Sequence, residues 1–175
     1  VNPKEELRRQ EQDSMTFREL GMGPYLDLVK TTCRHWRKKL QQLERVWLPA
    51  IGKKRVRDLT PSDFETELQR LSRRGRTGST INRHRALVHH MMNYALRLGL
   101  VDSNPVARVP RRKEGAPRDK FMTDEQMAAF IRETENCEPT SGAILKVLAC
   151  SGLRAGEVMS LALSAIDWQE STIYL

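Results

Sequence analysis

Apolar residues recur every three or four positions along most of the chain, which is the spacing of one face of an α-helix. The clearest such stripe consists of Trp36, Leu40, Leu43, Trp47 and Ala50. Pro49 and Gly52 mark the end of this helix, because proline lacks a backbone N–H and glycine commonly follows the last helical turn. The pattern predicts a mainly α-helical protein.

Capping residues mark the starts of two further helices. Thr16 and Glu19 have the spacing of a capping box and predict a helix over about residues 16–30, whose continuity from Gly21 to Pro24 the sequence leaves open. Thr60 is an expected N-cap, followed by a proline at the first helical position and an acid at the third. The apolar residues that this helix is expected to bury are Phe64, Leu68 and Leu71.

The longest predicted helix runs from Ser79, its expected N-cap, to about Leu98, and Gly99 stops it. Its expected buried face consists of Ile81, Val88, Met91, Met92, Ala95 and Leu98. The polar residues left for solvent or a ligand are Asn82, Arg83, Arg85, His89, His90, Asn93 and Arg97.

Four segments follow from these elements. Residues 1–15 lack an apolar period and are interpreted as a tail or the remnant of a preceding segment. Residues 16–106 form a helical unit, and 107–118 have the proline, glycine and basic content of a linker. Residues 119–175 begin a second unit.

The second unit is predicted to combine helices with a strand. A capping box at residues 123–126 opens one helix, an apolar helix follows over 144–151, and a shorter helix covers 153–163. Residues 172–175 have strand composition, and no partner strand is predicted for them in this chain.

Charge is distributed unevenly along the chain. Residues 1–118 carry 26 Lys and Arg against 13 Asp and Glu, whereas 119–175 carry 4 against 9, which together give the net charge of +8. A basic surface attracts polyanions, of which nucleic acid is the commonest soluble one. The alternative is a solvated basic surface without a partner.

Several classes of protein are disfavoured by the residues themselves. Cys33, Cys137 and Cys150 are too widely spaced for a disulfide framework or a zinc site, so no metal is expected. The sequence lacks a run of about 18 apolar residues, a signal peptide and a glycine-rich phosphate loop. We therefore expect a cytoplasmic protein without a membrane partner or a small-molecule substrate.

A motif at residues 150–161, CSGLRAGEVMSL, carries the most specific signal. It resembles the first arginine motif of the tyrosine recombinases, the phage-integrase family, in which a Gly-Leu-Arg turn precedes a helix with Glu and Leu at fixed offsets. Further pieces follow the family's order, namely Thr60-Pro61 with Asp63, Thr80-Ile81-Asn82-Arg83, Tyr94-Ala95, Asn104-Pro105, Met122-Thr123 with Glu125, and Ala165-Ile166-Asp167-Trp168. In the last piece Ala165 replaces an acid of the family. The resemblance covers about residues 16–175.

The resemblance implies a SAM-like helical core-binding domain followed by the truncated start of an α/β catalytic domain. It implies site-specific DNA recombination or integration through a 3′-phosphotyrosyl intermediate, without a cofactor. Arg154 would donate two hydrogen bonds to a DNA phosphate. Glu157 would orient neighbouring catalytic groups or close the fold, and it would not be a metal ligand. The nucleophile would lie beyond Leu175, so this chain alone is expected to be inactive, with Tyr174 an ordinary strand residue. The competing interpretation of Arg154 is a structural ion pair with Glu157.

The expected partners are double-stranded DNA and other recombinase protomers. The residues expected to contact DNA are Arg34, Arg37, Lys38, Lys53, Lys54, Arg55, Arg74, Arg76, Thr80, Asn82, Arg83 and Lys120. Two other hypotheses remain open, a non-catalytic DNA-binding prophage remnant and a helical transcription factor. A gene that continues past Leu175 with a Tyr and a His-x-x-Arg motif would argue against the remnant, whereas a promoter-specific footprint would favour the transcription factor.

Overall fold

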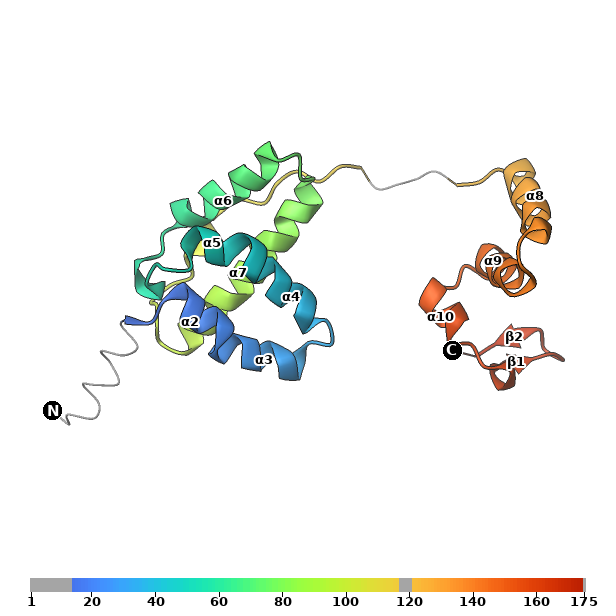
Figure 1. Ribbon diagram of the computed structural model, residues 1–175, viewed down its shortest axis with the longest axis horizontal. Coiled ribbons are helices and arrows are strands. Elements are labelled where there is room, and N and C mark those ends of the chain that lie inside the picture. The colour runs from blue at the N-terminus through green and yellow to red at the C-terminus, as the bar shows by residue number, and fades with distance from the viewer. Residues whose placement is uncertain (1–13, 117–120, 175) are drawn as a thin grey trace. The chain divides into compact units, whose positions relative to one another are not determined.

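Two compact units make up the part of the chain that the computed structural model describes, residues 14–116 and 121–174 (Figure 1). The first is helical, and the second combines helices with a two-stranded sheet. The prediction of a mainly helical protein is confirmed. Within these described ranges, no helix is both long and apolar enough to cross a membrane.

The first predicted helix is two helices, α2 (Phe17–Met22) and α3 (Pro24–Thr32), which separate at Gly23. The break arises because the residue after Gly23 is a proline, which has no N–H to continue the ladder of α2. Thr16 caps α2 through the expected capping box. Its Oγ1 accepts from the Glu19 N–H at 3.2 Å, and its own N–H donates to Glu19 Oε2 at 2.7 Å.

The second predicted helix changes geometry in its middle. α4 (Trp36–Gln42) leads into a turn of π-helix, η1 (Leu43–Trp47), and then into α5 (Leu48–Ile51). A π-turn adds a residue to the helical turn and so shifts the buried stripe. Ala50, which was expected in the core, is therefore exposed, and Ile51 is buried instead.

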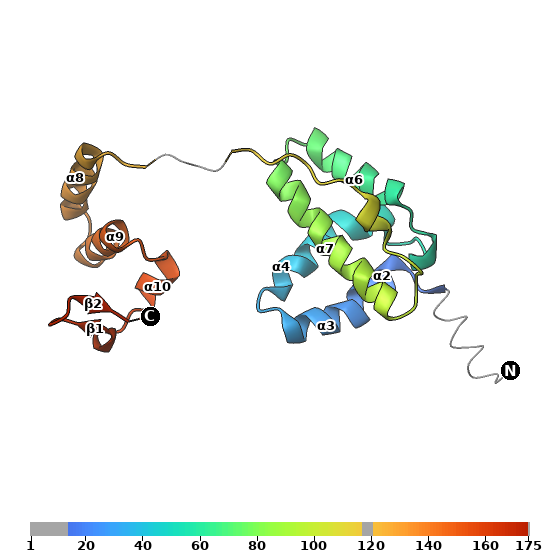
Figure 2. The ribbon, with the colours of Figure 1, turned by 180° about the vertical axis from the view of Figure 1, so that it is seen from behind.

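The short 3₁₀ turn η2 (Val56–Asp58) leads to α6 (Pro61–Arg73), which lies beside α7 (Gly78–Arg97) in both views (Figures 1 and 2). Thr60 caps α6 as predicted. The cap of α7 is Thr77, two residues before the expected Ser79. Leu98 follows the last residue of α7 and is 38% exposed, so its predicted burial is wrong.

Aromatic rings form the centre of the helical unit. Phe17, Trp47 and Phe64 are fully buried, and the Phe64 ring centroid lies 6.3 Å from that of Phe17 and 5.9 Å from that of Trp47. Met91 and Met92 of α7 are also fully buried, which confirms them as core residues.

Residues expected to begin a linker are packed onto the helical unit. They start with the 3₁₀ turn η3 (Pro105–Arg108), after which Val109 is 2% exposed and belongs to the core. Arg85, which was expected to face solvent or a ligand, donates from Nε to the Val109 carbonyl at 2.7 Å. The linker interpretation of 107–118 therefore does not hold for 107–109, nor for Arg112 and Glu114, which bind Asn82 of α7. Residues 117–118 lie outside the described part.

The second unit has few deeply buried side chains. Its helical elements are α8 (Asp124–Glu133), η4 (Thr134–Asn136), α9 (Pro139–Ser151), α10 (Ala155–Met159) and η5 (Leu163–Ala165). The capping box that opens α8 is confirmed, and Gly152, with φ of 67°, ends α9. Among the apolar residues described between 121 and 174, Val158 alone is less than a tenth exposed.

The expected lone strand has a partner. β2 (Thr172–Ile173) pairs antiparallel with β1 (Ile166–Asp167), so that Ile173 lies opposite Ile166. Asp167 Oδ1 accepts from the backbone N–H groups of Gln169 and Glu170 at 2.9 and 3.0 Å and thereby fixes the turn. The sequence did not reveal β1, because a strand of two residues carries too little periodicity.

Candidate nucleic-acid interface

Three arginines surround one hollow on the helical unit. The hollow has a volume of about 390 Å³ and lies where α4 and η1 meet the end of α6 and the start of α7. We call it the arginine hollow, and it is lined by Gln41, Gln42, Arg45, Val46, Leu71, Arg74, Arg76, Thr80 and His84. None of these lining residues is an Asp or Glu, so the lining contains three cations and no carboxylate. A concave surface of one charge concentrates ions of the opposite sign.

A tight turn between two helices places two of these arginines. Gly75 follows α6 with φ of 75°, a left-handed conformation that glycine adopts without strain, and its N–H donates to the Ser72 carbonyl at 2.9 Å. Thr77 then caps α7. Arg74 and Arg76 therefore flank the turn at the junction of the two helices.

His84 is a buried residue of the arginine hollow. This residue is 8% exposed, and its Nδ1 has no hydrogen-bond partner among the described residues. Burial lowers the pKa of His84 and the charge of Arg76 lowers it further, against the opposite effect of Glu67. The imidazole is therefore neutral at pH 7, and the arginines supply the positive charge.

The predicted contacts near the start of α4 are exposed. They are Arg34, Arg37 and Lys38. The Arg37 guanidinium lies 4.9 Å from the centre of the Trp36 ring, a cation–π distance that limits where this long side chain points. Arg37 and Lys38 precede Gln41 and Gln42 of the hollow by one helical turn.

The predicted contacts at residues 53–55 lie away from the arginine hollow. Lys54 Nζ is 2.6 Å from Asp63 Oδ1, and Arg55 Nε is 2.8 Å from Asp58 Oδ2, so both cations have carboxylate partners. Asp63 lies in the first turn of α6, whereas Arg74 follows its last residue, a separation of about 16 Å along the helix. The structure does not gather these two basic groups into one site.

The predicted contacts on α7 differ in exposure. Thr80 lines the hollow and Arg83 is exposed. Asn82 was expected to face a ligand, but it is 7% exposed and its side chain binds residues 112 and 114. The expectation failed because a later segment of the chain covers this side of α7. Lys120 lies outside the described residues.

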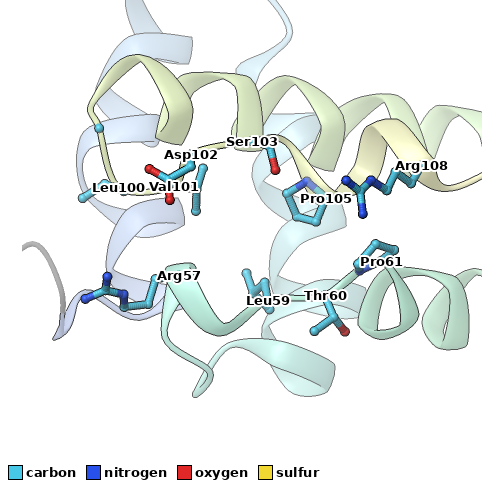
Figure 3. A pocket seen from close by; sticks show the side chains of 11 residues that line it. Arg57, Leu59, Thr60, Pro61, Leu100, Val101, Asp102, Ser103, Pro105 and Arg108 are labelled. Carbon is cyan, nitrogen blue, oxygen red and sulfur yellow. The ribbon is translucent and has the colours of Figure 1, made fainter.

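Two other hollows of the helical unit contain carboxylates. One, of about 320 Å³, lies between residues 57–61 and 99–108, and Figure 3 shows Asp102 in it, with Arg57 and Arg108 well apart. The other, of about 440 Å³, contains Asp63 and Glu67. A carboxylate in the lining opposes a bound phosphate, so the arginine hollow is the stronger candidate.

Arg154 lies at the N-cap of α10 in the second unit. Its side chain is 86% exposed, and its Nη1 donates to Glu157 Oε1 at 2.8 Å. The ion pair considered from the sequence is therefore present. It engages one end of the guanidinium, while the high exposure leaves the side chain open to a further partner.

Comparison with known proteins identifies the family. Residues 28–112 match the phage integrase central domain. The tyrosine recombinase XerC of Alcanivorax borkumensis is 32% identical over 119 residues, which cover 66% of this chain and 39% of that protein. The tyrosine recombinase XerD of Halalkalibacterium halodurans is 26% identical over 158 residues, which cover 89% of this chain and 52% of that protein.

A solved structure agrees in fold. A crystal structure of a lambda integrase (75–356) dimer bound to a COC′ core site superposes with a TM-score of 0.75 at 15% identity, covering 88% of this chain and 56% of that one. Residues 28–112 therefore belong to the phage integrase central domain family, and the chain is similar to tyrosine recombinases over most of its length. It spans 39% of the length of the XerC protein and 52% of the length of the XerD protein.

Sequence reasoning missed four polar residues of the arginine hollow as candidate contacts, Gln41, Gln42, Arg45 and His84. A signal for two of them was present, because Arg37, Gln41 and Arg45 follow at intervals of four and share one helical face. No sequence signal marked His84, whose position depends on how α7 packs.

Proposed function

We propose that this chain binds duplex DNA through the arginine hollow and acts as part of a site-specific tyrosine recombinase. The observation that carries the proposal is the grouping of Arg45, Arg74 and Arg76 around a hollow whose lining includes no carboxylate. A guanidinium can donate two parallel hydrogen bonds to one phosphate, so three of them suit the repeating phosphates of a DNA strand.

Most of these contacts position DNA and do not select its sequence. Phosphate contacts fix the register of a protein on a duplex but carry no base information. Gln41, Gln42 and Thr80 line the same hollow and offer side chains that can read base edges. Arg37 and Lys38, one turn earlier on α4, extend the basic surface.

In the whole recombinase, Arg154 would act on the phosphate that reacts. A tyrosine hydroxyl attacks that phosphate, forms a 3′-phosphotyrosyl bond and releases a 5′-hydroxyl. This hydroxyl later attacks the phosphotyrosyl bond of a partner strand, forms a new phosphodiester and releases that tyrosine. The guanidinium of Arg154 would stabilise the charge that develops on the nonbridging oxygens. Glu157 would hold that guanidinium in place. The family resemblance and the exposure of Arg154 support this role.

The test is a salt titration of DNA affinity with two matched triple variants. If about six phosphates are neutralised, log K against log salt has a slope of about −5 for the unchanged chain. Changing Arg45, Arg74 and Arg76 to Gln should reduce that slope by about 3. The control changes Arg18, Arg57 and Arg108 to Gln, which removes the same charge away from the arginine hollow. Equal changes of slope in both variants would contradict the proposed site.

The non-catalytic remnant and the transcription factor share the DNA-binding half of this proposal. A covalent adduct between the whole protein and a nicked suicide DNA substrate would exclude both. We expect no adduct from the 175-residue chain, because Tyr174 follows Arg154 too closely to match the family's nucleophile.

A further inference from the structure

The side chain of Asn82 joins α7 to a segment thirty residues later in the chain. Its Nδ2 donates to the Arg112 carbonyl at 2.9 Å, and its Oδ1 accepts from the Arg112 N–H at 2.8 Å. The amide thus satisfies both backbone groups of one residue, as a neighbouring strand would. Its Nδ2 also donates to Glu114 Oε1 at 2.7 Å.

A second attachment comes from α6. The Arg112 guanidinium forms an ion pair with Glu65, and both side chains are about three-quarters buried. The backbone is also close, because a Cβ atom added to Gly78 would lie 2.0 Å from the Lys113 carbonyl oxygen. Residues 112–114 therefore lie directly on the start of α7.

We propose that Asn82 and Glu65 form a latch that holds residues 110–114 on the helical unit. The connection to the second unit then begins at Gly115, and Arg111 and Lys113 are held close to the start of α7. Asn82 is a positioning residue, because it acts through the segment that it holds.

The latch has a consequence for DNA binding, and this part rests on the proposed function. Arg111 and Lys113 are exposed cations, and the latch keeps them near Thr80, which lines the arginine hollow. The latch also shortens the connection between the units, and a shorter connection raises the effective concentration of one DNA-binding unit for a site held by the other.

Trypsin tests the latch without DNA, because it cleaves after Arg111, Arg112 and Lys113. We expect Asn82→Ala to speed cleavage at these three bonds at least tenfold, read by mass spectrometry, with a cooperative thermal melt retained. The control is Ala86→Ser, at an exposed position of the same helix. Cleavage at the rate of the unchanged chain would overturn the proposal.

Two further variants keep the test decisive if Asn82→Ala unfolds. Glu65→Gln weakens the second attachment and should also speed cleavage. Asn82→Asp cannot donate to the Arg112 carbonyl and places a carboxylate against Glu114, so it should release residues 110–114. Adding Glu114→Gln removes the repulsion between the two carboxylates and should restore part of the protection from trypsin. Absence of any effect from both would contradict the latch.

DNA affinity then separates a positioning role from a purely structural one. Asn82→Ala should weaken DNA binding about two- to threefold, and it should have no further effect once Arg111 and Lys113 are both changed to Gln. Loss of protection with unchanged affinity would remove the positioning role. If the DNA affinity of the unchanged chain did not depend on salt, the proposed function would be refuted. The trypsin result does not depend on the proposed function.

Discussion

Arg154 donates two hydrogen bonds to the carboxylate of Glu157 across the first turn of α10. The Arg154 backbone N–H donates to Glu157 Oε2 at 2.7 Å, and its Nη1 donates to Oε1 at 2.8 Å. The backbone bond, followed by the side-chain bond, lowers the pKa of Glu157 below its ordinary value, so this carboxylate stays charged at neutral pH. Glu157 thus caps the start of α10 and also orients the guanidinium of Arg154. The structural and catalytic interpretations of Arg154 are therefore compatible.

In the whole recombinase, we expect Arg154→Ala to leave DNA binding nearly unchanged and to lower strand cleavage about 100-fold or more. The reason is that many other cations hold the DNA backbone, whereas a preorganised donor to the reacting phosphate is worth about this factor. Binding is measured by titration and cleavage with a suicide substrate.

The control for this prediction is Arg154→Lys, which keeps the charge but loses the two-pronged geometry and should rescue little. If Arg154→Ala reduces binding and cleavage in equal proportion, the residue only positions DNA.

Asp63 gives the helical unit a pH-dependent contribution to stability. Burial alone would raise its pKa, but hydrogen bonds from Lys54 and Thr60 outweigh burial and lower it below the ordinary 3.8. A carboxyl with a lowered pKa stabilises the folded state above its unfolded pKa, and this is lost as the pH falls through the folded pKa. Asp63→Asn should therefore cost about 1 kcal/mol at pH 7 and progressively less below about pH 4.

Urea unfolding of residues 1–116 at pH 7 and pH 3 measures this difference. The matched control is Asp58→Asn, whose side chain is 52% exposed and pairs with Arg55 at the surface, and it should change little at either pH. A stability difference for Asp63→Asn that is the same at both pH values would contradict the assignment.

Helix starts could be predicted from the sequence because their signals are local. Thr16 with Glu19, and Thr60 with Asp63, place a hydroxyl and a carboxylate three residues apart, and the structure contains both capping boxes. The Gly-Leu-Arg turn was visible for the same reason, since Gly152 has the left-handed conformation that ends α9.

Features that depend on distant parts of the chain could not be predicted in this way. The burial of Asn82 depends on residues 112–114, and a helical wheel of α7 holds no information about that segment. The π-turn moved the buried position from Ala50 to Ile51 because core packing overrode the regular helical period. The arginine hollow depends on the packing of several helices against one another. The sequence indicated its arginines only as members of separate basic groups.

The second unit should not fold cooperatively when it is expressed alone. Val158 is the one described apolar residue of this unit that is deeply buried, whereas Trp168 is 76% and Leu163 is 79% exposed. A few half-buried helices cannot offset the conformational entropy lost on folding. A thermal melt of residues 117–175, followed by circular dichroism, should show no sharp transition, and a cooperative one would contradict this prediction.

The boundary of the helical unit can be tested by truncation, because the structure places it after the position expected from the sequence. Residues 1–110 keep Val109 in the core but lack Arg112, which leaves the amide of Asn82 and the carboxylate of Glu65 without their partners. We expect both 1–110 and 1–116 to melt cooperatively, with 1–116 more stable by about 1–3 kcal/mol, the cost of leaving a buried polar group unsatisfied. Introducing Asn82→Ala into both fragments should reduce the difference in stability between them, because the attachment through Asn82 is then absent from 1–116 as well. Equal stability of 1–110 and 1–116 in urea unfolding would show that residues 111–116 rest on the surface without stabilising the fold.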